Sequence, residues 1–139
     1  MRPLDLLIKI LSSKPVYAHC DIPCGIYDPH SAQMAAHTVI RMTNMILDTK
    51  PESDALEHRR VFVHQMARLT KIKEEHAEAC KREITILWGD YFKPEHLEKY
   101  PELHDLVWKT LKLASKTKQN VDLETAQELL ANTQKIAEI

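Results

Sequence analysis

The pattern that most constrains this chain is a helical spacing of apolar residues that begins at Asp28 and continues to the C-terminus. Apolar side chains recur every three or four positions from residue 28 to about 49, from 53 to about 88, from 101, and again from 120 or 122. Short connections make neighbouring helices antiparallel. Only 2 glycines occur among 139 residues, which disfavours an all-β fold with its many turns. The sequence therefore predicts an all-α, up-down four-helix bundle.

Residues typical of helix ends mark the expected boundaries. Asp28 and Pro29 favour a helix start, with the aspartate as cap and the proline at the first helical position. Ser53 is expected to cap the second helix and Gly89 to end it. Pro94 is expected to begin a single helical turn that runs to Lys99 before the third helix starts.

The first 18 residues, MRPLDLLIKILSSKPVYA, have a different character. They begin like a secretory signal, but Asp5 and Lys9 interrupt the apolar centre, which should run unbroken for about 7–15 residues. We expect residues 1–18 to be a cytoplasmic leader cut off after Ala18, and residues 19–139 to form one domain whose first part, 19–27, is a non-helical hook. The formal charge of −1 gives no electrostatic footprint for nucleic acid, and no apolar run approaches the about 20 residues that span a membrane.

The hook reads His-Cys-Asp-Ile-Pro-Cys-Gly from residue 19. A tight turn at Pro23-Cys24-Gly25 would bring the sulfurs of Cys20 and Cys24 together. A cut before His19 would free an amino nitrogen one chelate ring away from the backbone nitrogen of Cys20. Amine, amide nitrogen and two thiolates then form a near-planar set of four donors, which the imidazole of His19 can cap.

Such a donor set selects its metal. Planar nitrogen and sulfur donors suit nickel(II) or copper(II), whereas zinc favours a tetrahedral site. Two thiolates tend to reduce copper(II), and strongly donating thiolate and amide ligands stabilise oxidised nickel. The donor chemistry of the hook therefore favours a nickel site that is oxidised and reduced by one electron.

Two stretches of the sequence resemble one known family. The string HCDIPCGIYDP at 19–29 is similar to the mature N-terminus of nickel-containing superoxide dismutases, and LWGDYFKPEHLEKYPELHDLV at 87–107 is similar to a second stretch of that family. The resemblance implies a homohexamer of four-helix bundles with one nickel ion per subunit. It also implies conversion of superoxide to oxygen and hydrogen peroxide by a Ni(II)/Ni(III) cycle.

The resemblance assigns roles by matching position. It implies that nickel is bound by the amine and imidazole of His19, the amide nitrogen and sulfur of Cys20, and the sulfur of Cys24. Asp21 and Tyr27 match residues that line the approach of the substrate. Tyr91 matches a residue hydrogen-bonded near that tyrosine.

The sequence departs from the family at the residues that orient the axial imidazole. Well-known members use a glutamate and an arginine, and the matching positions here hold Ala35 and His76. Since a hydrogen-bonded partner normally fixes the tautomer of a metal-bound histidine, we expect His76 to replace that pair, with His37 as the next candidate.

Other interpretations of the same residues remain open. Cys20 and Cys24 could form a disulfide or be idle thiols, and Cys80, in the middle of a helix, is expected to be a buried inert thiol. The alternative to an enzyme is a non-catalytic helical bundle that stores metal or senses thiol redox state. The enzyme requires a maturation protease as partner, because the amine of His19 exists only after cleavage.

Overall fold

The computed structural model describes residues 25–139, and within that range every regular element is a helix. The elements are α2 (His30–Asp48), α3 (Leu56–Ile86), the π-helical turn η1 (Leu87–Tyr91), α4 (Pro94–Lys99), α5 (Leu103–Gln119) and α6 (Leu123–Ala137). The predicted all-α class is thereby confirmed. The expected leader and the residues of the hook before Gly25 lie outside the described range.

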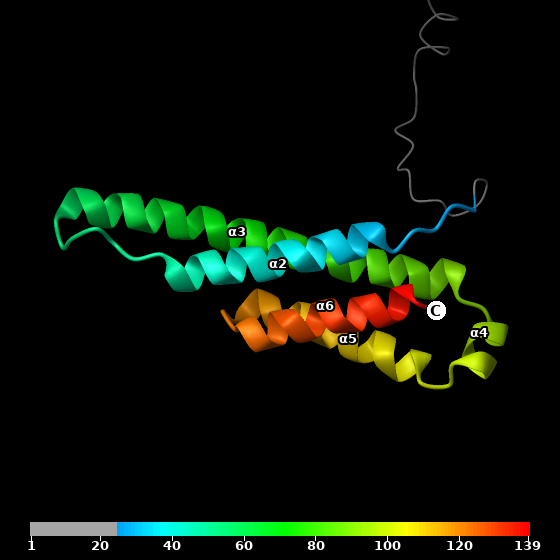
Figure 1. Ribbon diagram of the computed structural model, residues 1–139. Coiled ribbons are helices and arrows are strands. Elements are labelled where there is room, and N and C mark those ends of the chain that lie inside the picture. The colour runs from blue at the N-terminus through cyan, green and yellow to red at the C-terminus, as the bar shows by residue number, and fades with distance from the viewer. Residues whose placement is uncertain (1–24) are drawn as a thin grey trace, which may run out of the picture.

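The four long helices run alternately up and down, as the short connections predicted. Helices α2 and α3 form one antiparallel pair, and α5 and α6 form a second pair that packs against it (Figure 1). Each helix contacts two neighbours, because α2 also packs on α6 and α3 also packs on α5. Element α4 and the C-terminus lie at the end of the bundle where the described chain begins (Figure 1).

Small side chains let the helices approach closely at the centre of the bundle. Five alanines have no exposed surface, and larger apolar residues such as Ile84, Leu103 and Leu129 fill the spaces between them. Burying one such side chain contributes about 1.5–3 kcal/mol. The fully buried alanines are Ala32, Ala36, Ala77, Ala114 and Ala126.

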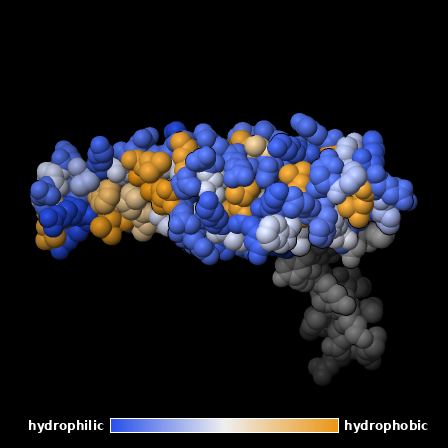
Figure 2. All heavy atoms as spheres, turned by 90° about the horizontal axis from the view of Figure 1, so that it is seen from below, coloured by the Kyte–Doolittle hydropathy of each residue, from blue (hydrophilic) through white to orange (hydrophobic). Residues whose placement is uncertain are grey.

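The first part of α3 extends beyond the rest of the bundle. Residues 56–68, called the α3 tip below, bury no side chain, and Leu69 is the first buried residue of the helix. Figure 1 shows that α5 and α6 end before this part of α3 begins. Figure 2 shows apolar surface gathered on the same projecting end of the α2–α3 pair.

The helix ends agree with the sequence at some positions and correct it at others. The turn from Pro94 to Lys99 is confirmed, and Asp122 caps α6 by accepting a hydrogen bond from the backbone nitrogen of Glu124 at 3.1 Å. The second helix starts at Leu56 and not at Ser53, whose hydroxyl instead accepts a hydrogen bond of 3.2 Å from the nitrogen of Ala55 in the preceding loop.

Gly89 does not end the second helix. The chain passes through it in η1, where the nitrogen of Phe92 donates to the carbonyl oxygen of Leu87 at 3.1 Å, a hydrogen bond that spans five residues. A glycine ends a helix by adopting a positive φ, and among the described glycines only Gly25 has one. The helical run ends at Phe92, whose backbone is extended.

Candidate metal centre

The described chain enters the bundle beside η1 and the end of α6. Gly25 has a φ of 61°, a left-handed conformation that costs glycine little and most other residues more. Asp28 then accepts a hydrogen bond of 2.8 Å from the nitrogen of His30 at the start of α2. Together these two residues shape the backbone of residues 25–28 where it joins α2.

Tyr27 and Tyr91 meet at this end of the molecule. Their ring centroids lie 5.7 Å apart with the planes tilted by 48°, a geometry typical of attractive aromatic pairs. The Tyr27 hydroxyl oxygen has almost no exposed surface. The structure therefore brings together Tyr27, assigned to the substrate approach, and Tyr91, assigned a place near it. Asp21, also assigned to the substrate approach, lies outside the described range.

A small cavity of about 70 Å³ lies between these tyrosines and the end of the chain. It is bounded by the N-terminal segment, by η1 and by the last turn of α6, which contributes Ile136 and Ile139. Because Tyr27 also packs against the core cluster that contains Ile136, the C-terminal turn supports the residue at the root of the hook. The lining residues are Tyr27, Pro29, Leu87, Tyr91, Phe92, Ile136, Ala137 and Ile139.

The π-helical turn positions Tyr91, and its neighbours hold it there. One extra residue in the last turn shifts Tyr91 relative to a continued α-helix. The ring of Tyr91 contacts Phe92 at 5.2 Å and His96 at 5.3 Å between centroids. The Nδ1 atom of His96 accepts a hydrogen bond of 3.0 Å from the nitrogen of Lys93, so in the neutral ring the proton is on Nε2.

His96 has no role in the predictions made from the sequence. The signal that could have revealed it is its position, because it is the third residue of a helix that begins with Pro94. A side chain at that position can accept a hydrogen bond from the backbone of the capping residue.

His76 lies apart from the two tyrosines. It is half-buried on α3, and its Nδ1 lies 2.9 Å from the carbonyl oxygen of Ile72, to which it donates. Eleven helical residues separate it from Leu87, which is about 16 Å along the axis. The structure does not bring His76 to Tyr27. The predicted contact between His76 and His19 stays a prediction, because His19 lies outside the described range. His37 is exposed, and Ala35 is buried.

The described part of the chain offers no alternative metal site. No group of three or more histidine, cysteine, aspartate or glutamate side chains in residues 25–139 could hold a metal ion. Cys80 is fully buried as predicted, and burial raises the pKa of its thiol to about 11, against a hydrogen bond with Thr133 that lowers it. Because a metal needs the thiolate, Cys80 is unsuitable. Residues 25–139 therefore hold no group that competes with the donors expected at His19, Cys20 and Cys24.

No helix in residues 25–139 is long and apolar enough to cross a membrane.

Comparisons with known proteins agree on one family. The family model for nickel-containing superoxide dismutase matches residues 14–139. The nickel superoxide dismutases of Streptomyces coelicolor and Streptomyces seoulensis are each 41% identical to this chain over 126 residues, which is 90% of this chain and 88% of theirs. A solved structure of native nickel superoxide dismutase superposes with a TM-score of 0.72 at 41% identity and covers 86% of this chain and 94% of that one. The chain belongs to the nickel-containing superoxide dismutase family.

Proposed function

We propose that the chain is made as an inactive precursor and that it disproportionates superoxide to oxygen and hydrogen peroxide after residues 1–18 are removed. Family membership supports a superoxide dismutase with a nickel cofactor and does not favour a non-catalytic metal-storage or redox-sensing bundle. The observation that carries the proposed location of the site is the contact between Tyr27 and Tyr91 at the root of the hook.

The proposed nickel ligands are the amine and imidazole of His19, the amide nitrogen and sulfur of Cys20, and the sulfur of Cys24. When bound, nickel supplies a one-electron exchange between its divalent and trivalent states. The lack of a competing metal cluster in residues 25–139 supports this assignment.

Tyr27 and Asp21 are proposed to line the approach to the metal, with Tyr91 held beside Tyr27. Tyr27 and Tyr91 pack as a pair, and the cavity behind them is only about 70 Å³. A path bordered by such packed rings is suited to a small anion and excludes larger reductants. We expect these residues to control access and hydrogen bonding, while nickel binding depends on the hook.

His76 is proposed to orient the axial imidazole of His19. Its Nδ1–H is held by the carbonyl oxygen of Ile72, so the Nε2 atom of the neutral ring is left as an acceptor. An acceptor of this kind is what the second ring N–H of a metal-bound histidine requires.

The leader controls activity by covalent chemistry. While Ala18 is joined to His19, the nitrogen of His19 is an amide without the basicity of an amine, so a maturation protease must act first. The interrupted apolar centre of the leader supports a cytoplasmic location. The exposed apolar residues of the α3 tip, among them Leu56, Val61 and Val63, support assembly into a homohexamer.

The test compares the full chain with a protein that begins at His19, both incubated with nickel. We expect one bound nickel per chain and superoxide consumption only for the shortened protein, with intact mass and metal analysis run on the same samples. Cys80→Ser in the shortened protein is the matched control and should retain both properties. A full chain that binds nickel, together with a shortened protein that consumes no superoxide above background, would support the metal-storage alternative.

A further inference from the structure

A groove along the outer faces of α5 and α6 carries more carboxylates than cations. Its volume is about 550 Å³. The Asp105 carboxylate is neutralised by Lys109 at 2.6 Å, but the other groove carboxylates make no ion pair with any residue in 25–139. The residues called the α5–α6 groove are Tyr100, Glu102, Asp105, Leu106, Lys109, Glu128, Asn132, Lys135, Glu138 and Ile139.

Asn132 adds a polar group to the wall of this groove. Its side chain is only 8% exposed, it lines the groove, and it makes no hydrogen bond with any other described residue. Its amide atoms are not fully buried and remain open to the groove. A cationic group with several N–H donors would satisfy both the amide oxygen of Asn132 and the neighbouring carboxylates.

The α3 tip presents such cations. Leu56, Arg59, Arg60, Val63 and His64 line a shallow hollow on its surface, and Leu56 and Val63 are 64% and 63% exposed. Arg59 reaches Asp54 at 3.8 Å, but both side chains are strongly exposed, so this ion pair contributes little. Arg60 makes no ion pair with any residue that the structure describes.

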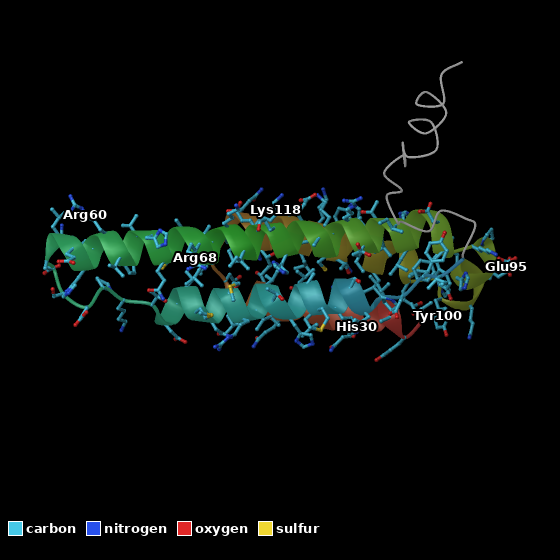
Figure 3. The ribbon with its side chains drawn as sticks, turned by 90° about the horizontal axis from the view of Figure 1, so that it is seen from above. His30, Arg60, Arg68, Glu95, Tyr100 and Lys118 are labelled. Carbon is cyan, nitrogen blue, oxygen red and sulfur yellow. The ribbon has the colours of Figure 1, made fainter. Side chains whose placement is uncertain are left out.

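The tip and the groove cannot meet within one molecule. In Figure 3, Arg60 projects from the start of α3 at one end of the bundle, and Tyr100 of the groove lies toward the opposite end. An α3 tip that enters the groove must therefore belong to a second copy of this chain, which carries the complementary charge.

We propose that the α3 tip of one copy docks into the α5–α6 groove of the next. Arginine guanidinium groups pair with the carboxylates of Glu102 and Glu128, and the exposed leucine and valine cover the apolar part of the groove. Because two different surfaces meet, the contact is head-to-tail and forms a closed ring when the rotation between copies closes. The inference rests on the proposed self-association and specifies its contact.

The proposed contact links self-association to the region around Tyr27. Ile139 lines both the α5–α6 groove and the small cavity bounded by Tyr27. A tip docked in the groove packs against the C-terminal turn that supports Tyr27. Assembly then stabilises the cavity wall against which Tyr27 packs.

Charge reversal on each side tests the contact. We expect Arg59→Glu/Arg60→Glu in the full chain to weaken self-association at least about tenfold, and Glu102→Lys/Glu128→Lys to do the same. The chain with all four substitutions should assemble again, as should an equimolar mixture of the two double variants. Mass photometry gives the assembly state, and circular dichroism confirms that each variant is folded. Arg82→Glu, on the part of α3 that the other helices cover, is the matched control and should assemble normally.

The outcomes separate the contact from self-association in general. Recovery of assembly in the four-substitution chain supports the docking. Double variants that assemble like the unchanged protein would overturn this contact while self-association stands. An unchanged chain that stays monomeric at every concentration would overturn both.

Discussion

The Nζ atom of Lys73 donates a hydrogen bond of 2.8 Å to the carbonyl oxygen of Asn120, just beyond the end of α5. The same amine donates to the carbonyl oxygens of Thr117 and Lys118. The side chain is only 1% exposed, and burial lowers its pKa. A lysine is tolerated at this position because it satisfies the last carbonyls of α5, which otherwise lack partners, and because a cation interacts favourably with a helix C-terminus.

Replacing Lys73 with methionine should destabilise the fold by about 1–3 kcal/mol, because three carbonyls lose their donor and that of Thr117 is buried. Urea unfolding followed by circular dichroism measures the change. Lys71→Met is the matched control: that side chain is 74% exposed and pairs only with Glu75, at 3.6 Å, so it should change stability by no more than about 0.5 kcal/mol. Equal effects at the two positions would contradict the capping role.

This lysine shows where sequence reasoning reaches its limit. The apolar spacing predicted the length and order of the helices, and Pro94 and Asp122 marked two starts correctly. The apolar spacing did not place Lys73 in the core, because the acceptors of the lysine are 44 to 47 residues away along the chain. A lysine without such acceptors would be exposed. Gly89 was misjudged because a π-helical turn depends on local packing, and composition does not report it.

Some residues of the candidate site were predicted from the sequence and others were not. The resemblance at 19–29 and 87–107 led to Tyr27 and Tyr91, which the structure places in contact. The support given by Ile136 was not predictable, because α6 reaches Tyr27 only through the fold. The position of His96 after Pro94 indicates a helix-cap residue, but its ring contact with Tyr91 also depends on the fold.

The raised pKa of Cys80 predicts a loss of stability at alkaline pH. Burial raises the pKa of its thiol to about 11 in the folded protein, from an ordinary value of 9.0. The unfolded chain therefore releases this proton first as pH rises. The contribution of Cys80 to stability is complete below pH 9 and is lost between about pH 9 and 11, by about 1 kcal/mol at pH 10.

The measurement compares the free energy of unfolding at pH 8 and pH 10 for the unchanged chain and for Cys80→Ala, so that other ionisations cancel. We expect the alkaline loss to be smaller in the variant. Thiol-reactive reagents should also label Cys80 only after unfolding. Rapid labelling of native Cys80, or equal alkaline losses in the two proteins, would show that the thiol is not shielded.

Two substitutions at Tyr91 separate the contribution of its aromatic ring from that of its hydroxyl group. Tyr91→Leu removes the contacts with Tyr27 and His96 and should cost about 0.5–1.5 kcal/mol for each aromatic pair lost. Tyr91→Phe keeps the rings and should leave stability within about 0.5 kcal/mol, while it lowers superoxide consumption by the nickel-loaded protein that begins at His19. A phenylalanine variant with full activity would exclude a role for the hydroxyl.

His96 should be replaceable by a residue that keeps its hydrogen bond. Glutamine can accept from the nitrogen of Lys93 at this position, so His96→Gln should retain most of the stability, whereas His96→Ala should lose about 1 kcal/mol. Hydrogen exchange measured by mass spectrometry should show faster exchange in residues 87–96 of the alanine variant only. If the two variants exchange alike, the ring contacts with Tyr91 and Phe92 matter more than the hydrogen bond.

Ile136 tests whether the C-terminal turn supports the metal centre beyond its contribution to stability. Ile136→Val removes one methylene from a side chain that is 2% exposed and lines the cavity bounded by Tyr27, and it should cost about 0.5–1.5 kcal/mol. Ile46→Val is the matched control, because that side chain is 7% exposed and lies about 24 Å along α2 from His30. Both variants should lose similar stability, but only the first should lower the activity of the nickel-loaded protein, because only there does the enlarged cavity let the Tyr27 ring move. Equal activities at equal stability would mean that the Tyr27–Tyr91 pair holds its position without the C-terminal turn.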